Sequence, residues 1–372
     1  MWFLPYTAFR LTTAGAWCSL LPSYGQVCGA GLPCPLSSWK GAQLLPLTMT
    51  AGWPLRLRNT FLLAACADLL AARFTTTRRP TSIQADLAMN SPARSSGVGV
   101  AVMQAVTLAV HLGNGGGRVH PERLAADLAS AWQNSPHSSP TGTRMVLAAV
   151  TAGTGWQTVA AGLRDGQGSC GSDAAVRAIA AGLLPGTLAV IAETARAATA
   201  VTHTHPLGAD GAAVTAVAVA LAARGEPSSG PAAARFLAAT AAASHGPQFP
   251  SVLPMVRTLV LHRAGPAEAA ATLRPGTTTL RTVPAALTAY LRYPGDPAAA
   301  IRYAVMLGGP NRAIAAITAA LAGAACPTFT PPAPWLPSAA ARQHIRTAAS
   351  LLAGLADTAT AAPPPLPANG SL

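Results

Sequence analysis

From residue 55 onward, runs of small and aliphatic residues alternate with short stretches rich in Gly, Pro, Ser and Asn. Each run is long enough for a helix, and the residues between the runs are those that commonly end one. Alternating β-branched residues, which would predict strands, never continue beyond a few positions. The pattern therefore predicts an all-α protein. Its expected helices cover residues 61–74, 98–112, 121–132, 173–184, 188–202, 209–224, 232–244, 252–263, 266–273, 283–290, 297–305, 313–325 and 339–355.

The composition favours one large helical domain. Hydrophobic residues make up 51% of the 372 residues and charged residues only 10%, and Ala is the commonest of the hydrophobic residues. Small residues allow helices to pack closely, as in bundles. A chain of this length is sufficient for one large domain or two ordinary ones.

The two ends of the chain differ from this middle part. Residues 1–54 hold most of the Trp residues, three Cys and no acidic residue, and they show no helical period. They are either a disordered extension or a segment foreign to the natural protein, whose translation would then begin at Met49; we favour the second interpretation. The Pro-rich residues 357–372 are predicted to be disordered. The helical domain is thus expected to cover residues 55–356.

Charge, cysteines and hydropathy exclude several classes of protein. The net charge is +13, but the Arg residues are scattered and only Arg78 and Arg79 are adjacent. A nucleic-acid-binding surface should instead gather its charge on one face, so we predict no nucleic-acid partner. The six Cys show no zinc-binding spacing and predict no disulfide framework. No uninterrupted apolar run is long enough to span a membrane, and the N-terminus makes a poor signal peptide. We therefore expect a cytoplasmic protein without a membrane partner.

A Gly-rich loop precedes one of the predicted helices. Gly166, Gly168 and Gly171 alternate with small polar residues, and Ser172 or Asp173 can cap the helix that follows. Backbone N–H groups at such a place can bind an anion. On the pattern alone, a tight turn before a capped helix is the commoner explanation.

Two further stretches hold unusual polar residues. His203 and His205 stand just before Pro206. Because no third metal ligand is evident, one of them is expected to pack or to bind a ligand rather than to hold a metal. Near the end, the helix of residues 313–325 follows Pro310, Asn311 and Arg312. A cation is unexpected there, because the start of a helix carries partial positive charge.

Three stretches together resemble the ADP-ribosylglycohydrolase family, whose members are all-helical hydrolases that release ADP-ribose from modified proteins. The resemblance is carried by GSDAAVRAIAAGLL, by THTHP and by TVPAALTAYLRYPGDPAAAIRYAVMLGGPNRAIAAITAALAGA. The stretch LRNTFLLAACADLLAARF is weakly similar to the family's first helix. The likeness covers residues 55–336.

The resemblance implies that the family's magnesium ligands are missing. Family members hold two magnesium ions with a Thr/Ser-Asp-Asp-Thr run at the start of an early helix and an Asp-Thr-Asp-Thr run after a Gly-Gly pair. Here the second run reads Pro310, Asn311, Arg312 and Ala313, and residues 88–121 contain no Asp or Glu. Asp68 remains, but one carboxylate does not satisfy a magnesium pair. We therefore expect no metal and no other cofactor.

The function expected from this resemblance is binding of ADP-ribose or a related nucleotide, or of a protein carrying it, without magnesium-dependent hydrolysis: a pseudoenzyme. Arg312 would supply charge to a phosphate or turn into solvent. One alternative is metal-independent hydrolysis by Asp173, Glu193 or Asp210; another is a scaffold protein without a ligand. The predicted ligand-binding residues are Gly168, Ser169, Cys170, Gly171, Ser172, Asp173, His205 and Arg312, and no catalytic residue is assigned.

Overall fold

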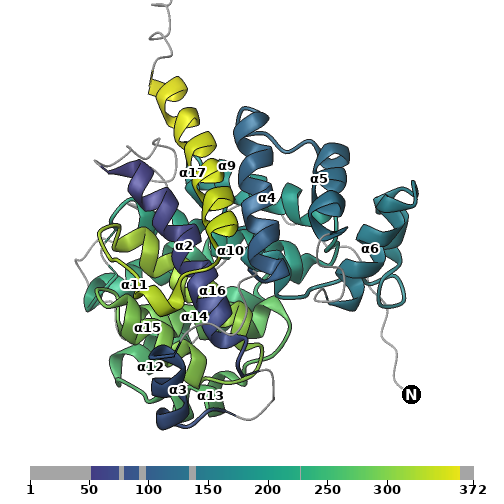
Figure 1. Ribbon diagram of the computed structural model, residues 1–372. Coiled ribbons are helices and arrows are strands. Elements are labelled where there is room, and N and C mark those ends of the chain that lie inside the picture. The colour runs from purple at the N-terminus through teal and green to yellow at the C-terminus, as the bar shows by residue number, and fades with distance from the viewer. Residues whose placement is uncertain (1–51, 75–78, 92–97, 134–139, 227, 361–372) are drawn as a thin grey trace, which may run out of the picture. The chain divides into compact units, whose positions relative to one another are not determined.

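The structure is a computed structural model that describes residues 52–74, 79–91, 98–133, 140–226 and 228–360, with side chains to residue 356 (Figure 1). The predicted N-terminal extension, the proposed start at Met49 and most of the predicted Pro-rich tail lie outside these residues. The described helices belong to one unit, residues 45–372. They begin at Trp53, close to the predicted limit of residue 55, and the last helix continues to Thr360.

The described residues form helices and contain no strand, which confirms the all-α prediction. Three helices were not predicted, α3, α6 and α7, and the predicted helix 173–184 is broken into α8 and a short 3-10 turn. The α-helices are α2 (Trp53–Ala71), α3 (Ser82–Met89), α4 (Val100–Asn114), α5 (Pro121–Gln133), α6 (Thr141–Thr151), α7 (Trp156–Gly162), α8 (Asp173–Arg177), α9 (Leu188–Ala200), α10 (Pro206–Ala223), α11 (Pro231–Ala241), α12 (Gln248–Leu261), α13 (Pro266–Leu273), α14 (Thr279–Arg292), α15 (Pro297–Met306), α16 (Asn311–Ala325) and α17 (Ala339–Thr360).

The centre of the fold is the contact between α2 and α16, which lie side by side although they are far apart in the sequence (Figure 1). A Cβ atom on Gly323 of α16 would lie 2.5 Å from the backbone oxygen of Asn59 on α2. The absence of a side chain at this position therefore lets the two backbones touch. The Asn59 amide also donates hydrogen bonds to the carbonyls of Pro327 (3.0 Å) and Phe329 (2.9 Å), just beyond α16.

Helix α10 packs against α9, α14 and α16 in the interior. Within the described part of the chain it is the one helix that is long and apolar enough to cross a membrane, and 83% of that stretch is buried against its neighbours. This apolar surface packs against the neighbouring helices of the fold.

Helices α5, α6 and α7 form a small accessory cluster. Val146, Ala160 and Leu163 are buried together. The Trp156 indole N–H donates to Glu122 at 2.6 Å, which ties α7 to α5. This packing brings the start of α6 and the end of the α7 segment to the edge of the cavity described next.

Candidate functional site

A cavity of about 700 Å³ lies where α2, α4, α6, α8 and α16 converge. Its volume is in the range of small-molecule sites. The predicted Gly-rich loop and the residues after the Gly-Gly pair both reach it. Its lining includes Asp68, Phe74, Val100, Thr143, Leu163, Arg164, Ser169, Gly171, Ser172, Asp173, His203, Asn311 and Arg312.

Most of the predicted ligand-binding residues meet at this cavity. Ser169, Gly171, Ser172, Asp173 and Arg312 line it, although Arg312 comes from a different part of the chain. Gly168 and Cys170 are not among the lining residues. Gly168 instead shapes the loop: its φ is 76°, and a Cβ there would lie 2.8 Å from the backbone nitrogen of His205.

The Gly-rich loop is held by hydrogen bonds to the segment before α14. Ser172 donates its backbone N–H to Thr277 at 2.8 Å, and Cys170 accepts one from Thr279 at 2.9 Å. The N–H of Gly171 lies 3.3 Å from the Ser169 hydroxyl. The anion cradle expected from the Gly pattern therefore has fewer backbone donors to offer a ligand, because these N–H groups already have partners.

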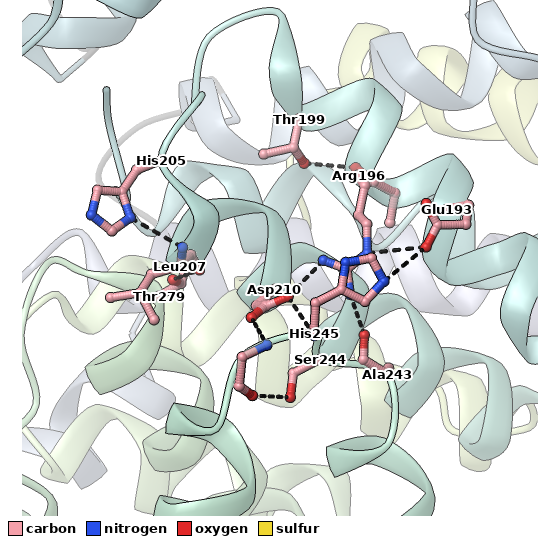
Figure 2. A network of polar contacts seen from close by, with 12 residues as sticks. Glu193, Arg196, Thr199, His205, Leu207, Asp210, Ala243, Ser244, His245 and Thr279 are labelled. Atoms are coloured by element: carbon pink, nitrogen blue, oxygen red, sulfur yellow. Dashed lines mark hydrogen bonds and ion pairs between the residues drawn. The ribbon is translucent and has the colours of Figure 1, made fainter. Parts of the chain in front are cut away.

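His203, and not the predicted His205, lines the cavity. The Nδ1 atom of His205 accepts a hydrogen bond from the backbone N–H of Leu207 at 3.0 Å, so His205 caps the start of α10 (Figure 2). The predicted ligand-binding histidine is thus a helix cap, and its neighbour two positions earlier is the one at the cavity.

Buried polar groups lie behind His203. The fully buried Arg177 guanidinium donates to the Thr202 hydroxyl, which lies 2.7 Å from Nδ1 of His203. Because the guanidinium can only donate, the Thr202 hydroxyl accepts from it and keeps its own hydrogen for Nδ1 of His203, an arrangement that favours the ring hydrogen on Nε2. Burial and the charge of Arg177 lower the pKa of His203 to about 3. His203 is therefore a neutral hydrogen-bond donor at physiological pH.

Arg312 forms a two-pronged ion pair with Asp68 of α2. Its Nε and Nη2 donate to the two carboxylate oxygens at 2.9 and 2.7 Å, and the backbone N–H of Gly99 adds a third bond at 2.8 Å. Only 3% of the Asp68 side chain is exposed, against 39% for Arg312. The structure thus adds a partner that the sequence did not indicate: the Asp68 carboxylate holds Arg312 at the cavity through Nε and Nη2.

The first turn of α4 lies directly on this ion pair. A Cβ atom on Gly99, the residue that precedes α4, would collide with the Arg312 guanidinium and the Asp68 carboxylate. Glycine is therefore the residue that allows α4 to start here. The carboxylate in turn stabilises the partial positive charge at the beginning of α4.

Asp173 is a second carboxyl group in the cavity, in a different environment. Its residue is 7% exposed, and its Oδ2 atom has no hydrogen-bond partner. Burial raises its pKa to about 6, and nearby Asp68 adds to the rise, while Arg177 and Arg312 oppose it. The cavity thus combines an ion-paired aspartate with one that titrates near neutral pH.

The donor set does not fit the family's pair of magnesium ions. A guanidinium occupies both oxygens of Asp68, and Mg²⁺ requires several oxygen ligands that are free to bind it. Among the described residues, no three His, Cys, Asp or Glu side chains are grouped as metal ligands.

The other two carboxylates considered for metal-independent hydrolysis are not among the residues that line the cavity; both belong to the polar network of Figure 2. Asp210 accepts from Arg196 at 2.6 Å and from the backbone N–H groups of His245 and Gly246, each at 2.9 Å. Although burial opposes it, these bonds hold the pKa of Asp210 below its ordinary value. Glu193 pairs with the same Arg196 at 3.2 Å. This network fastens the turn after α11 to α9 and α10.

Comparison with known proteins gives a consistent picture. The family model of ADP-ribosylglycohydrolase matches residues 50–362. A solved structure titled "ADP-ribosylglycohydrolase-related protein complex" is similar with a TM-score of 0.57 and 20% identity, over 82% of this chain and 100% of that one. At this identity the likeness shows the fold alone. No curated protein matches the chain.

Proposed function

Because the chain belongs to the ADP-ribosylglycohydrolase family, we propose that its cavity binds ADP-ribose or a chemically similar nucleotide without magnesium. The observation that carries this proposal is the Arg312–Asp68 ion pair. It places a fixed cation in the cavity next to a carboxylate that would otherwise be free to bind a metal. We infer that this protein is a nucleotide-binding relative that lacks the family's magnesium-dependent hydrolysis.

The charges of the cavity support a phosphate-bearing ligand. The charges of Asp68 and Arg312 cancel, while Arg164 in the lining and Arg177 behind it outweigh Asp173 even when Asp173 is ionised. A cavity of net positive charge attracts anions. The Nη1 atom of Arg312 takes no part in the ion pair, so it is the guanidinium nitrogen best suited to meet a phosphate oxygen.

Neutral hydrogen-bond donors complete this environment. The Nε2–H of His203 and the hydroxyl groups of Ser169 and Ser172 come from residues that line the cavity. Such donors can bind phosphate or ribose oxygens without changing their charge between pH 5 and 8. The scaffold alternative would instead favour a cavity filled by large side chains, which the volume of about 700 Å³ argues against.

One observation favours a second function, hydrolysis without metal. A carboxyl group with a pKa of about 6, such as Asp173, can donate a proton to a leaving group near neutral pH. A glycosidic bond usually needs a second carboxylate as base or nucleophile. Asp68 is the nearby acidic side chain in the lining, and Arg312 occupies it. Binding without turnover is therefore the function we favour.

Calorimetric titration of ADP-ribose into the full-length protein tests this proposal. We expect the same dissociation constant in magnesium and in EDTA, because the cation that faces the ligand is Arg312 and not a metal ion. An assay for release of ADP-ribose from a modified protein, run in both buffers, should show no turnover. Binding that requires magnesium, or no binding in either buffer, would refute the proposal; turnover in EDTA would favour the second function.

His203→Ala is expected to weaken ADP-ribose binding by about five- to tenfold, the effect of losing one neutral hydrogen bond. Its affinity should depend on pH between 6.5 and 8 just as the wild type does, because His203 stays neutral over this range. His245→Ala is the matched control, since 72% of that side chain is exposed and it is not among the lining residues. Equal affinities of the two variants would remove His203 from the site.

A further inference from the structure

A second cavity of about 680 Å³ runs along the other side of α4, between α5 and α17. On α4 it is lined by Val100, Met103, Gln104, Thr107 and Val110, whose spacing places them on one face of the helix. Val100 also lines the first cavity, so the first turn of α4 separates the two. Neither the family resemblance nor the proposed nucleotide site uses this space.

Gln104 is the unusual residue of this second cavity. It is 3% exposed, yet neither its side-chain nitrogen nor its oxygen has a hydrogen-bond partner. Buried amides in native proteins are normally paired with protein groups, water or a ligand. Leaving both a donor and an acceptor unpaired is unfavourable, and the apolar neighbours Met103 and Val106 offer no bond. A molecule in the cavity is one way to satisfy both ends at once.

We propose that the cavity between α4, α5 and α17 binds an uncharged, planar small molecule that carries a carboxamide or lactam edge. The amide of Gln104 has one hydrogen-bond donor side and one acceptor side, and an amide edge presents the complementary acceptor and donor. The remaining lining is mainly apolar on the α4 side, with Leu128 and Trp132 on α5. Such a surface suits the flat apolar body of an aromatic amide.

The polar residues at this cavity favour a neutral ligand over an ion. Arg123 and Asp127 of α5 contribute one charge of each sign. Asp127 is also bonded to Nδ1 of the buried His111 at 2.7 Å, which holds its carboxylate in place. Because the opposite charges balance, neither a cation nor an anion is attracted selectively. This differs from the first cavity, where Arg residues prevail.

Benzamide is the probe for this site, compared with ethylbenzene, which has a similar shape but no amide, and with benzoate. Calorimetry or ligand-observed NMR on the full-length protein should show benzamide binding at about millimolar affinity, as expected for so small a ligand. Ethylbenzene and benzoate should bind at least about tenfold more weakly, because neither can pair with both ends of the Gln104 amide. Saturating ADP-ribose should not displace benzamide, since the two cavities are separate.

Two variants test the assignment from different directions. Gln104→Leu keeps the size of the side chain and removes the amide; it should abolish the preference for benzamide over ethylbenzene and raise the melting temperature. Thr107→Trp fills the cavity and should abolish binding of both molecules. Absence of benzamide binding, competition by ADP-ribose, or an unchanged preference in Gln104→Leu would each overturn the proposal. The proposal is supported if Gln104→Leu loses the preference for benzamide over ethylbenzene and Thr107→Trp binds neither molecule.

Discussion

Arg312→Ala is expected to lower the free energy of unfolding by about 2–4 kcal/mol at pH 7.5. The substitution leaves the Asp68 carboxylate, 3% exposed, with the backbone N–H of Gly99 as its remaining hydrogen bond. Removing one partner of a buried ion pair costs about 3–5 kcal/mol, because the other charge stays buried and unpaired. We expect a somewhat smaller loss here, since 39% of the Arg312 side chain is exposed and water can enter where it was. Urea denaturation measures the effect.

The chain supplies a matched control for this experiment. Arg302 forms a similar two-pronged pair with Asp86, but both side chains are largely exposed, 37% and 52%. Arg302→Ala should therefore cost no more than about 1 kcal/mol. Adding Asp68→Asn to Arg312→Ala should recover much of the lost stability, because the buried charge is then gone. If Arg312→Ala costs no more than Arg302→Ala, the Asp68 pair does not anchor the site.

Asp173→Asn should stabilise the protein at pH 8 by up to about 3 kcal/mol. The pKa of Asp173 is raised from 3.8 to about 6 in the folded state, so folding favours its protonated form. As the pH rises from about 4 to above 6, the folded protein must ionise this buried group against its environment, and stability falls. Each pKa unit corresponds to about 1.4 kcal/mol. Asparagine stays neutral and avoids this loss, although Arg177 then loses a nearby negative charge.

The pH dependence distinguishes this cause from a general effect of the substitution. The stability difference between Asp173→Asn and the wild type should shrink toward zero by pH 4, where the wild-type carboxyl group is protonated in the folded state. Melting temperatures at pH 4, 6 and 8 are sufficient to test it. Glu226→Gln is the control: it removes an acidic charge at an exposed position after α10. Its stability difference from the wild type should not change with pH in this way. A difference that does not change with pH would contradict the raised pKa.

The helical periods predicted most of the fold, and the failures have identifiable causes. Helices α6 and α7 are short and contain Gly142 and Gly162, which weaken the helical signal. Helix α3 is also short, but its start could have been found. Thr81 and Gln84 form a capping box, with the Thr81 hydroxyl accepting from the Gln84 N–H and the Gln84 side chain accepting from the Thr81 N–H.

The site was only partly predictable because its key contacts are tertiary. The sequence indicated that Arg312 was out of place and that Asp68 remained, but their pairing bridges 244 positions and leaves no local pattern. Likewise, His203 and His205 look equivalent in the sequence, but His205 is the N-cap of α10 whereas His203 lines the cavity. Arg177 did carry a signal: an Arg inside the apolar stretch AVRAIAA needs buried acceptors, which the Ala198 carbonyl and Thr202 supply.

The backbone contact between α2 and α16 also determines when the domain can close. Asn59 and Gly323 are separated by most of the domain, so the centre of the fold cannot form until a ribosome has released the segment beyond residue 325. During that time the apolar surface of α2, including Phe61 and Leu63, has no permanent partner. We therefore expect folding of this chain to depend on a late, long-range docking step, of the kind that is slow and exposed to aggregation.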